Sequence, residues 1–215
     1  MNIDIADDSR EAGRRAAEAG ADRLRQALDQ ADRAVIVLAT GSSQFDMLER
    51  LVAEPGIEWP RVTAFHLDEY VGIDAAHPAS FRRYLRERFV ERLPQPIGAF
   101  QYIDGNARPE EEVVRLSQLI RARPIDVAFV GIGENGHLAF NDPPADFETS
   151  APFLSVKLDE ISRRQQLGEG WFASLDEVPD TAISMSVRQI MSARTIVCTE
   201  CPFCLAAFSR RRTSS

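Results

Sequence analysis

Short apolar segments alternate with longer stretches of helical character along the chain. The unbroken run from Ala34 to Ala39 is typical of a parallel strand buried on both faces. Further apolar segments at residues 62–67, 125–130, 181–185 and 194–199 are interpreted as strands. Between and before them, apolar spacing and boundary residues predict helices. These helices are expected at residues 7–30, 45–52, 80–93, 109–122, 158–166 and 187–192.

Several polar residues are assigned to helix boundaries. Ser43 is expected to cap the helix that follows it, with Asp46 three residues further on. Pro109 falls in the first turn of its helix, where a missing N–H is harmless. His77 is expected to precede a helix, whereas His66 lies in a predicted strand and is interpreted as a core histidine.

The order of these elements predicts a three-layer α/β/α fold of Rossmann-like type. Strands and helices alternate from residue 34 onward, which favours a mostly parallel sheet with helices on both faces. Residues 1–199 are expected to form a single domain, and residues 200–215 an atypical tail. Ligands of such sheets bind beyond the carboxyl ends of the strands. Thr40–Ser43, Asp68–Tyr70 and Gly131–Asp142 all follow strand ends, so they are expected to meet at one edge.

Composition narrows the possible partners. The formal net charge is -8, which disfavours nucleic-acid binding because a phosphate backbone requires clustered Lys and Arg. No apolar run approaches the length of about 20 residues that spans a membrane. The N-terminal residues lack a signal-peptide core, so a cytoplasmic protein is expected. The three cysteines, Cys198, Cys201 and Cys204, lack a fourth ligand nearby, so no metal site is predicted. Cys198 is expected to be a buried thiol.

A glycine loop carries the most distinctive candidate chemistry. Gly131, Gly133 and Gly136 fit the G-x-G-x-x-G dinucleotide pattern, but that pattern requires a helix to begin at its third glycine. Pro143 and Pro144 follow too soon for such a helix, so dinucleotide binding is disfavoured. His137 lies in this loop rather than on an apolar face, and it needs an orienting partner. Asn135 and Asp142 are the nearest candidates.

Two other segments offer groups that could act with this loop. Thr40, Gly41, Ser42 and Ser43 supply hydroxyls and N–H groups at a helix start, where an anion is favoured; a simple turn with a cap is the alternative. Asp68 and Glu69 end a buried strand, and alternation lets only one of them easily face a ligand. A carboxylate there could act as a general base or could cap a turn or pair with an arginine.

These segments together resemble the glucosamine-6-phosphate deaminase/isomerase family. The matching motifs are Leu-Ala-Thr-Gly-Ser-Ser at 38–43, Phe-His-Leu-Asp-Glu-Tyr-Val-Gly at 65–72, His-Pro-Ala-Ser at 77–80 and the glycine loop at 131–143. The related 6-phosphogluconolactonases share the fold and a similar loop. They typically have Arg where this chain has Tyr70, and they lack the Phe140-Asn141-acid-Pro143 ending. The deaminase branch is therefore preferred.

The resemblance implies an aldose–ketose isomerisation of a 2-amino-2-deoxyhexose 6-phosphate that releases ammonia and fructose 6-phosphate. It assigns proton transfer between C2 and C1 to Asp68, and ring opening to His137 with two flanking acids. It assigns phosphate binding to the Thr40–Ser43 turn, and Glu69 and Gly136 are also expected to contact substrate. No metal or organic cofactor is implied. A homo-oligomer is possible within this family.

The chain departs from the family pattern in three places. One flanking acid is replaced by Asn135, and the other is Asp142 where Glu is usual. The family normally continues past the last predicted strand with a helix whose lysine contacts phosphate. Residues 200–215 contain no lysine, so a truncated or frame-shifted terminus is expected. These departures leave two alternatives open: a non-catalytic hexose-phosphate binding module, and a 6-phosphogluconolactonase-like hydrolase.

Overall fold

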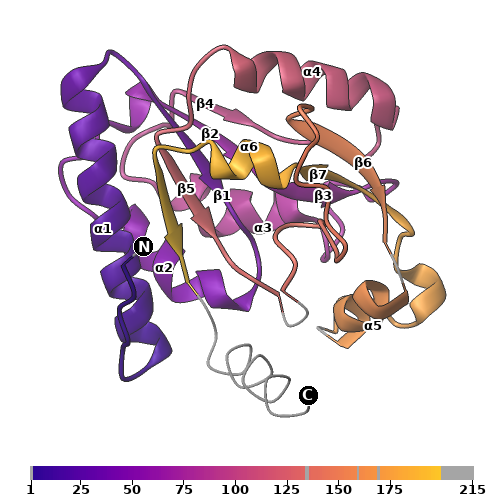
Figure 1. Cartoon of the computed structure of the whole chain (residues 1–215). Coiled ribbons are helices and arrows are strands. Elements are labelled where there is room, and N and C mark those ends of the chain that lie inside the picture. Colours follow the sequence, from indigo (N-terminus) through magenta and orange to yellow (C-terminus); the bar gives the residue numbers. More distant parts are fainter. Residues whose placement is uncertain (1, 134–135, 159, 169, 200–215) are drawn as a thin grey trace.

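A five-stranded parallel sheet forms the centre of the molecule (Figure 1). The computed structural model describes residues 2–133, 136–158, 160–168 and 170–199. The sheet has the order β4-β2-β1-β5-β8, and each neighbouring pair is parallel. Its strands are β1 (Ala34–Leu38), β2 (Val62–His66), β4 (Ala99–Gln101), β5 (Val127–Val130) and β8 (Thr195–Cys198). The predicted parallel sheet is therefore confirmed, with β4 as an additional edge strand that the hydrophobic pattern did not indicate.

The described residues contain six α-helices, each within a few residues of its predicted position. They are α1 (Ser9–Gln30), α2 (Phe45–Val52), α3 (Phe81–Arg88), α4 (Pro109–Arg121), α5 (Glu160–Gly168) and α6 (Val187–Met191). Asp8 caps α1 and Ser80 caps α3 through their side-chain oxygens. Single turns of 3-10 helix lie at Ser42–Gln44, Trp59–Arg61, Val90–Arg92 and Leu175–Glu177. His77 precedes α3 as predicted, and its Nδ1 accepts the N–H of Ala79 at 3.1 Å.

Alternating side chains of β1 build two hydrophobic cores on opposite faces of the sheet. Ala34, Ile36 and Leu38 belong to a core that includes residues of α1, α2 and α3. Val35 and Val37 belong to the other core, which includes residues of α4, α6 and a second sheet. A strand buried on both faces requires apolar residues at every position, which explains the unbroken run in the sequence. The predicted three-layer α/β/α fold is thereby confirmed.

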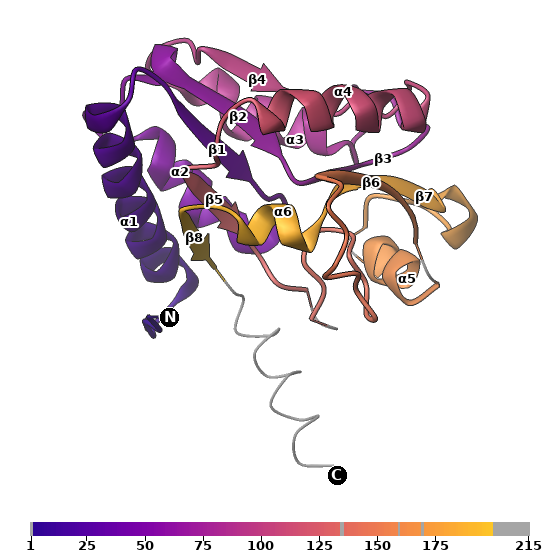
Figure 2. The same ribbon diagram turned by 45° about the horizontal axis from the view of Figure 1, so that its top comes forward.

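A second, antiparallel sheet completes the layer on the side of α4 and α6. It has the order β3-β7-β6 and consists of β3 (Asp68–Tyr70), β7 (Thr181–Met185) and β6 (Phe153–Lys157). Figures 1 and 2 both place this sheet and α5 on the opposite side of the molecule from α1. The assumption that residues 181–185 continue the parallel alternation was therefore wrong, and β6 was not predicted. In β6 exposed and partly buried positions alternate, as expected for a half-covered strand.

Leu67 joins the two sheets. Its N–H donates to the carbonyl of Leu38 in β1 at 3.2 Å, and its carbonyl accepts the N–H of Met185 in β7 at 2.7 Å. The chain thus leaves the parallel sheet after β2 and enters the antiparallel sheet at Asp68 within a single residue. Asp68 is consequently held at the boundary between both sheets.

Among the described helices, none is long and apolar enough to cross a membrane.

Candidate functional site

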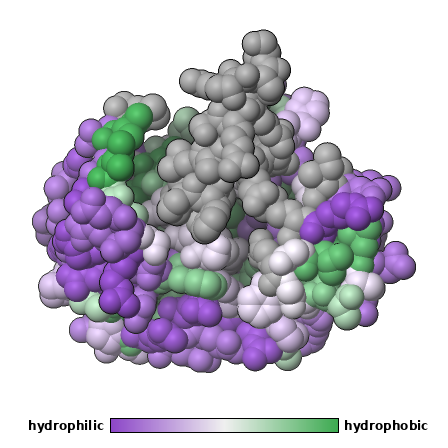
Figure 3. Space-filling model, turned by 90° about the horizontal axis from the view of Figure 1, so that it is seen from below, coloured by the Kyte–Doolittle hydropathy of each residue, from purple (hydrophilic) through white to green (hydrophobic). Residues whose placement is uncertain are grey.

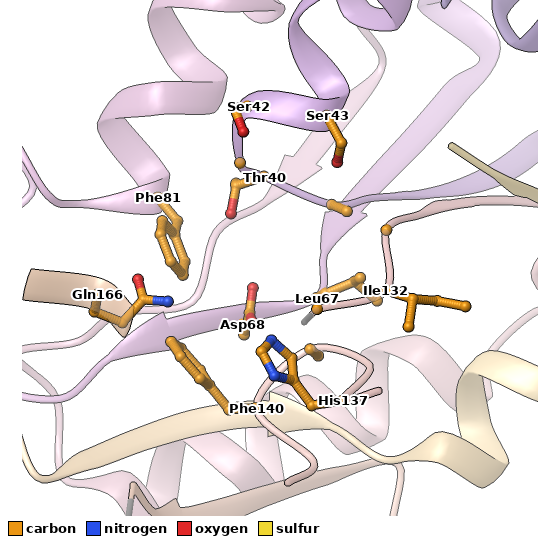
Figure 4. Close-up of a pocket in the computed structure, with 15 residues that line it drawn as sticks. Thr40, Ser42, Ser43, Leu67, Asp68, Phe81, Ile132, His137, Phe140 and Gln166 are labelled. Atoms are coloured by element: carbon orange, nitrogen blue, oxygen red, sulfur yellow. The ribbon is translucent and has the colours of Figure 1, made fainter. Parts of the chain in front are cut away.

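A cavity opens where the parallel strands end. In Figure 1, β5 and β8 point toward the lower side of the molecule. Figure 3 shows the molecule from this lower side, where hydrophilic residues are prominent around the edge of the view. The turn after β1, the start of β3 and the glycine loop after β5 all contribute to the cavity wall. The described residues that line it are Ala39, Thr40, Gly41, Ser42, Ser43, Leu67, Asp68, Phe81, Gly131, Ile132, Gly133, His137, Ala139, Phe140 and Gln166. Segments from five parts of the described sequence therefore meet at one place (Figure 4).

The turn from Thr40 to Ser43 forms one wall. Gly41 has a φ of 102°, a conformation that side chains rarely permit, and its carbonyl accepts a hydrogen bond from the Tyr84 hydroxyl at 2.9 Å. The turn continues into the 3-10 segment Ser42–Gln44 and then α2. The first N–H groups of a helix have no partner within it, so they are suited to an anion. The expectation that Ser43 caps α2 was wrong, because Gln44 is the N-cap residue and no side chain caps that helix.

Gln44 fixes this turn to the neighbouring strands. Its side chain is fully buried, and its amide nitrogen donates to the Thr199 hydroxyl at 2.7 Å and to the carbonyl of Val130 at 3.4 Å. A Cβ atom at Gly131 would lie 3.0 Å from the Ser43 hydroxyl and 3.2 Å from the Gln44 amide nitrogen. Glycine at position 131 therefore lets the turn after β1 pack closely against the end of β5.

Asp68 and Glu69 face opposite sides of β3, as strand alternation requires. Asp68 lines the cavity, whereas Glu69 is fully buried at the beginning of α3. The Glu69 carboxylate accepts hydrogen bonds from the Ser80 hydroxyl at 2.8 Å and from the Arg82 N–H at 2.9 Å. Burial raises the pKa of the Glu69 carboxyl, and these hydrogen bonds oppose that rise. The structure places Glu69, which was expected to contact substrate, outside the cavity lining, because the start of α3 takes up its oxygens.

The glycine loop folds back on itself and presents His137 to the cavity. The N–H of Gly133 donates to the carbonyl of His137 at 2.9 Å, and Ile132 bridges to Leu138. The imidazole packs directly on Gly133, where a Cβ atom would lie 2.2 Å from the ring. The Asp142 carboxylate lies 3.6 Å from His137 Nδ1, and both side chains are largely covered. This acid is close enough to orient the ring.

Asn141 anchors the loop to the second sheet. Its amide nitrogen donates to the carbonyl of Leu138 at 2.7 Å and to the carbonyl of Met185 at 2.9 Å. The buried hydroxyl of Ser184 accepts the N–H of Phe140 at 3.1 Å. Ser184 is also the register partner of Asp68 in the β3–β7 pair. The loop that carries His137 and the strand that carries Asp68 are thus attached to the same strand, β7.

Some predicted site residues lie elsewhere. Asp142 stands behind His137 and does not itself line the cavity. Gly131 and Gly133 of this loop contact the cavity rather than Gly136, which has a φ of 89° at the exposed tip. Asn135 lies outside the described residues, as do residues 200–215 and their two cysteines.

The structure also adds residues that sequence reasoning missed. Phe81 begins α3 and Gln166 belongs to α5, and neither forms part of a recognisable motif. Both are remote in sequence from the three strand-end segments. The only available signal for Phe81 was its position directly after the His77–Ser80 motif.

The charge of the cavity is unusual for an anion site. Among the described residues that line it, the ionisable side chains are Asp68 and His137, and no Lys or Arg is present. An anion bound there would be held by N–H and hydroxyl groups of the Thr40–Ser43 turn.

Two further predicted side chains lie outside the cavity. His66 is a core histidine as predicted: burial lowers its pKa to about 3, and its Nε2 accepts the N–H of Ile103 at 2.8 Å. Cys198 is exposed, so the expectation of a buried thiol was wrong. Within the described part of the chain, no three His, Cys, Asp or Glu side chains are grouped as a metal site would require.

Comparison with known proteins agrees with this arrangement. A family model described as glucosamine-6-phosphate isomerases/6-phosphogluconolactonase matches residues 7–199. The chain belongs to this family. A glucosamine-6-phosphate deaminase of Streptococcus pneumoniae (strain 70585) is 33% identical over 165 residues, which cover 74% of this chain and 66% of the relative. The matched part thus spans slightly less than two thirds of that protein.

Solved structures show the same fold. A monomeric glucosamine-6-phosphate deaminase superposes with a TM-score of 0.80 and 28% identity, over 92% of this chain and 81% of that chain. A 6-phosphogluconolactonase from Shewanella baltica OS155 gives a TM-score of 0.74 at 20% identity, over 95% of this chain and 83% of that chain. The second likeness shows the fold alone, so the activity must be argued from the cavity.

Proposed function

We propose that this chain converts a 2-amino-2-deoxyhexose 6-phosphate, such as glucosamine 6-phosphate, and water into fructose 6-phosphate and ammonia. The observation that carries the proposal is the meeting of Asp68 and His137 at one cavity whose other wall is the Thr40–Ser43 turn (Figure 4). An aldose–ketose isomerisation needs a base at the carbons next to the carbonyl and a separate group at the ring oxygen. The Asp68 carboxylate suits the role of the base, and the His137 imidazole suits the role of the group at the ring oxygen.

The substrate phosphate binds at the Thr40–Ser43 turn. The N–H groups at the start of the 3-10 segment and the hydroxyls of Thr40, Ser42 and Ser43 are suited to phosphate oxygens. Anchoring the phosphate there directs the other end of the sugar toward Asp68 and His137. This positioning converts proton transfer into a reaction within one complex.

His137 opens the sugar ring by moving a proton between the ring oxygen and the C1 hydroxyl. Asp142 acts through His137, because its carboxylate lies 3.6 Å from Nδ1 and can hold the ring in orientation. Asp68 then removes the proton from C2 and returns it to C1, which leaves an imine at C2. Hydrolysis of that imine releases ammonia and gives the ketose phosphate.

The test is an assay of the purified protein with glucosamine 6-phosphate and galactosamine 6-phosphate, measuring ammonia and fructose 6-phosphate. Turnover of either sugar is expected. The Asp68→Asn variant should lose at least about 100-fold in kcat, because the base is absent, while calorimetry still detects sugar-phosphate binding. Failure of both sugars to react contradicts the proposal.

A hydrolase assay separates this function from the related one. The same preparation is offered 6-phosphogluconolactone, and its hydrolysis is measured against the spontaneous rate. We expect no acceleration, since the site lacks an arginine at position 70, which the lactonases typically have. Acceleration of lactone hydrolysis without release of ammonia from the amino sugars would assign the site to the lactonase reaction.

A further inference from the structure

We propose that Gln166, held in place by Tyr70, is a specificity-determining residue that donates a hydrogen bond to a hydroxyl group in the middle of the sugar, at C3 or C4. The inference rests on the proposed function, because that function places the phosphate and the reacting carbons at the two ends of the cavity. It assigns a role to two residues that the catalytic steps do not use.

Gln166 is a buried polar side chain that faces the cavity. Only 7% of its surface is exposed, yet it is part of the cavity wall. A buried amide needs partners for both its oxygen and its nitrogen. The Tyr70 hydroxyl donates to Gln166 Oε1. Figure 4 shows the amide nitrogen directed into the cavity on the side of Asp68.

Tyr70 cannot easily move away from this hydrogen bond. It is 1% exposed, and its ring lies 5.0 Å from Phe81, 5.3 Å from Phe140 and 5.6 Å from Phe172, measured between ring centres. Aromatic contacts of this kind fix the ring in one orientation. The tyrosine therefore determines which end of the Gln166 amide meets a ligand, and the end that it leaves for the ligand is a donor.

The shape of the cavity indicates which part of the sugar this donor meets. With the phosphate at the Thr40–Ser43 turn, C6 lies at that wall, and C1 and C2 lie near Asp68. The carbons between them would lie beside Phe81 and Gln166, which Figure 4 shows to one side of the space between the turn and Asp68, with Phe140 beyond Asp68. The stacked rings of Phe81 and Phe140, 5.9 Å apart, offer an apolar surface to the C–H groups of the sugar. Gln166 is the polar group on that wall.

Such a donor rejects sugars that lack the matching hydroxyl. A site built to hydrogen-bond a hydroxyl leaves its own polar group unpaired when the hydroxyl is missing, so discrimination is strong. An inverted hydroxyl is mismatched in the same way. Gln166 would thus influence the choice between gluco and galacto substrates if its partner is the C4 hydroxyl.

The test compares the unmodified protein with Gln166→Leu and Tyr70→Phe on glucosamine 6-phosphate and on its 3-deoxy and 4-deoxy analogues. Removing one of these hydroxyls should lower kcat/KM of the unmodified protein by about tenfold or more. Gln166→Leu should lower kcat/KM on the full substrate similarly, mainly through KM, and should be insensitive to loss of that hydroxyl. Tyr70→Phe should show a smaller loss at the same hydroxyl.

Two controls keep a folding defect apart from the proposed role. Gln118→Leu makes the same chemical change on the exposed surface of α4 and should leave kinetics unchanged. A merely structural role of Gln166 would lower activity equally on all three sugars. That result, or equal sensitivity of Gln166→Leu and the unmodified protein to each missing hydroxyl, overturns the inference while the proposed function stands.

If the unmodified protein turns over neither amino sugar, the proposed function fails and the inference is tested by binding alone. Calorimetry then measures Kd for glucosamine 6-phosphate and the two deoxy analogues. A loss of affinity on removal of one hydroxyl that disappears in Gln166→Leu supports the inference. Equal dissociation constants for all three sugars, or the absence of sugar binding, overturn it.

Discussion

Replacing Gly133 with alanine should displace the imidazole of His137 without changing any group that reacts. In the structure a Cβ atom at position 133 would lie 2.2 Å from the ring, whereas ordinary contact begins at 3.4 Å. The ring must therefore retreat by about 1.2 Å, or the loop must shift by the same amount. Gly133 also donates its N–H to the carbonyl of His137, so the loop cannot yield at that point without losing this hydrogen bond.

The expected loss of activity follows from that displacement. A misplacement of about 1 Å at a reacting group can lower the rate by about 100-fold. Overpacking of this size also destabilises a protein by about 1–3 kcal/mol. Because the Thr40–Ser43 turn, which is proposed to bind the phosphate, lies on another segment, Kd for the sugar phosphate should change much less than kcat. The perturbation thus acts selectively on the step that uses His137.

The assay measures ammonia release by Gly133→Ala across a range of substrate concentrations, together with Kd for fructose 6-phosphate and the thermal midpoint. Gly168→Ala is the matched control, because no atom lies within 4 Å of its added Cβ. The control should retain kcat within about twofold, as surface substitutions generally do. If Gly133→Ala keeps kcat within about threefold of the unmodified protein, the close packing of ring and glycine does not position His137, and the reasoning is refuted.

Two further predictions concern stability. The pKa of His66 is about 3 in the folded protein and about 6.5 when unfolded, chiefly because of burial. The unfolded chain binds more protons between these values, so stability is full above pH 6.5 and falls by at most about 5 kcal/mol toward pH 3. His66→Gln, which can still accept the N–H of Ile103, should flatten this slope in thermal unfolding measured from pH 3 to 8; an unchanged slope contradicts the assignment. Asn141→Ala removes the donors to Leu138 and Met185 and should lower the free energy of unfolding in urea by about 2 kcal/mol; a change below about 0.5 kcal/mol would show that these bonds do not anchor the loop.

The sequence predicts the location of the cavity because its walls follow from a rule about strand ends. Once the apolar runs at residues 34–39, 62–67 and 125–130 are accepted as parallel strands, the segments after them must share an edge of the sheet. The rule therefore predicted correctly that the segments after those runs, which contain Thr40, Asp68 and His137, meet at one cavity. Their catalytic roles stay predictions until the assays are done.

The errors arose where long-range packing decides the outcome. Alternation shows that Asp68 and Glu69 face opposite ways, but only the position of α3 reveals that its first N–H groups take up Glu69. Gln166 could not be found, since nothing near it in sequence indicates that α5 reaches the cavity. Residues 181–185 satisfy the pattern of a strand in either sheet, because hydrophobicity does not encode strand direction.

The attachment of two segments to Ser184 has a consequence for how this fold can acquire new reactions. Asp68 pairs with this residue through the backbone, and the loop of His137 is tied to its hydroxyl. The Thr40–Ser43 turn instead continues from β1 in the other sheet. In the proposed function, the turn that would bind the phosphate thus rests on the parallel sheet, whereas Asp68 rests on the antiparallel sheet. The His137 loop leaves the parallel sheet after β5 and is tied to the antiparallel sheet at Ser184. Mutations in the antiparallel sheet can change the residues that are proposed to react, while the Thr40–Ser43 turn that is proposed to hold the phosphate is inherited unchanged.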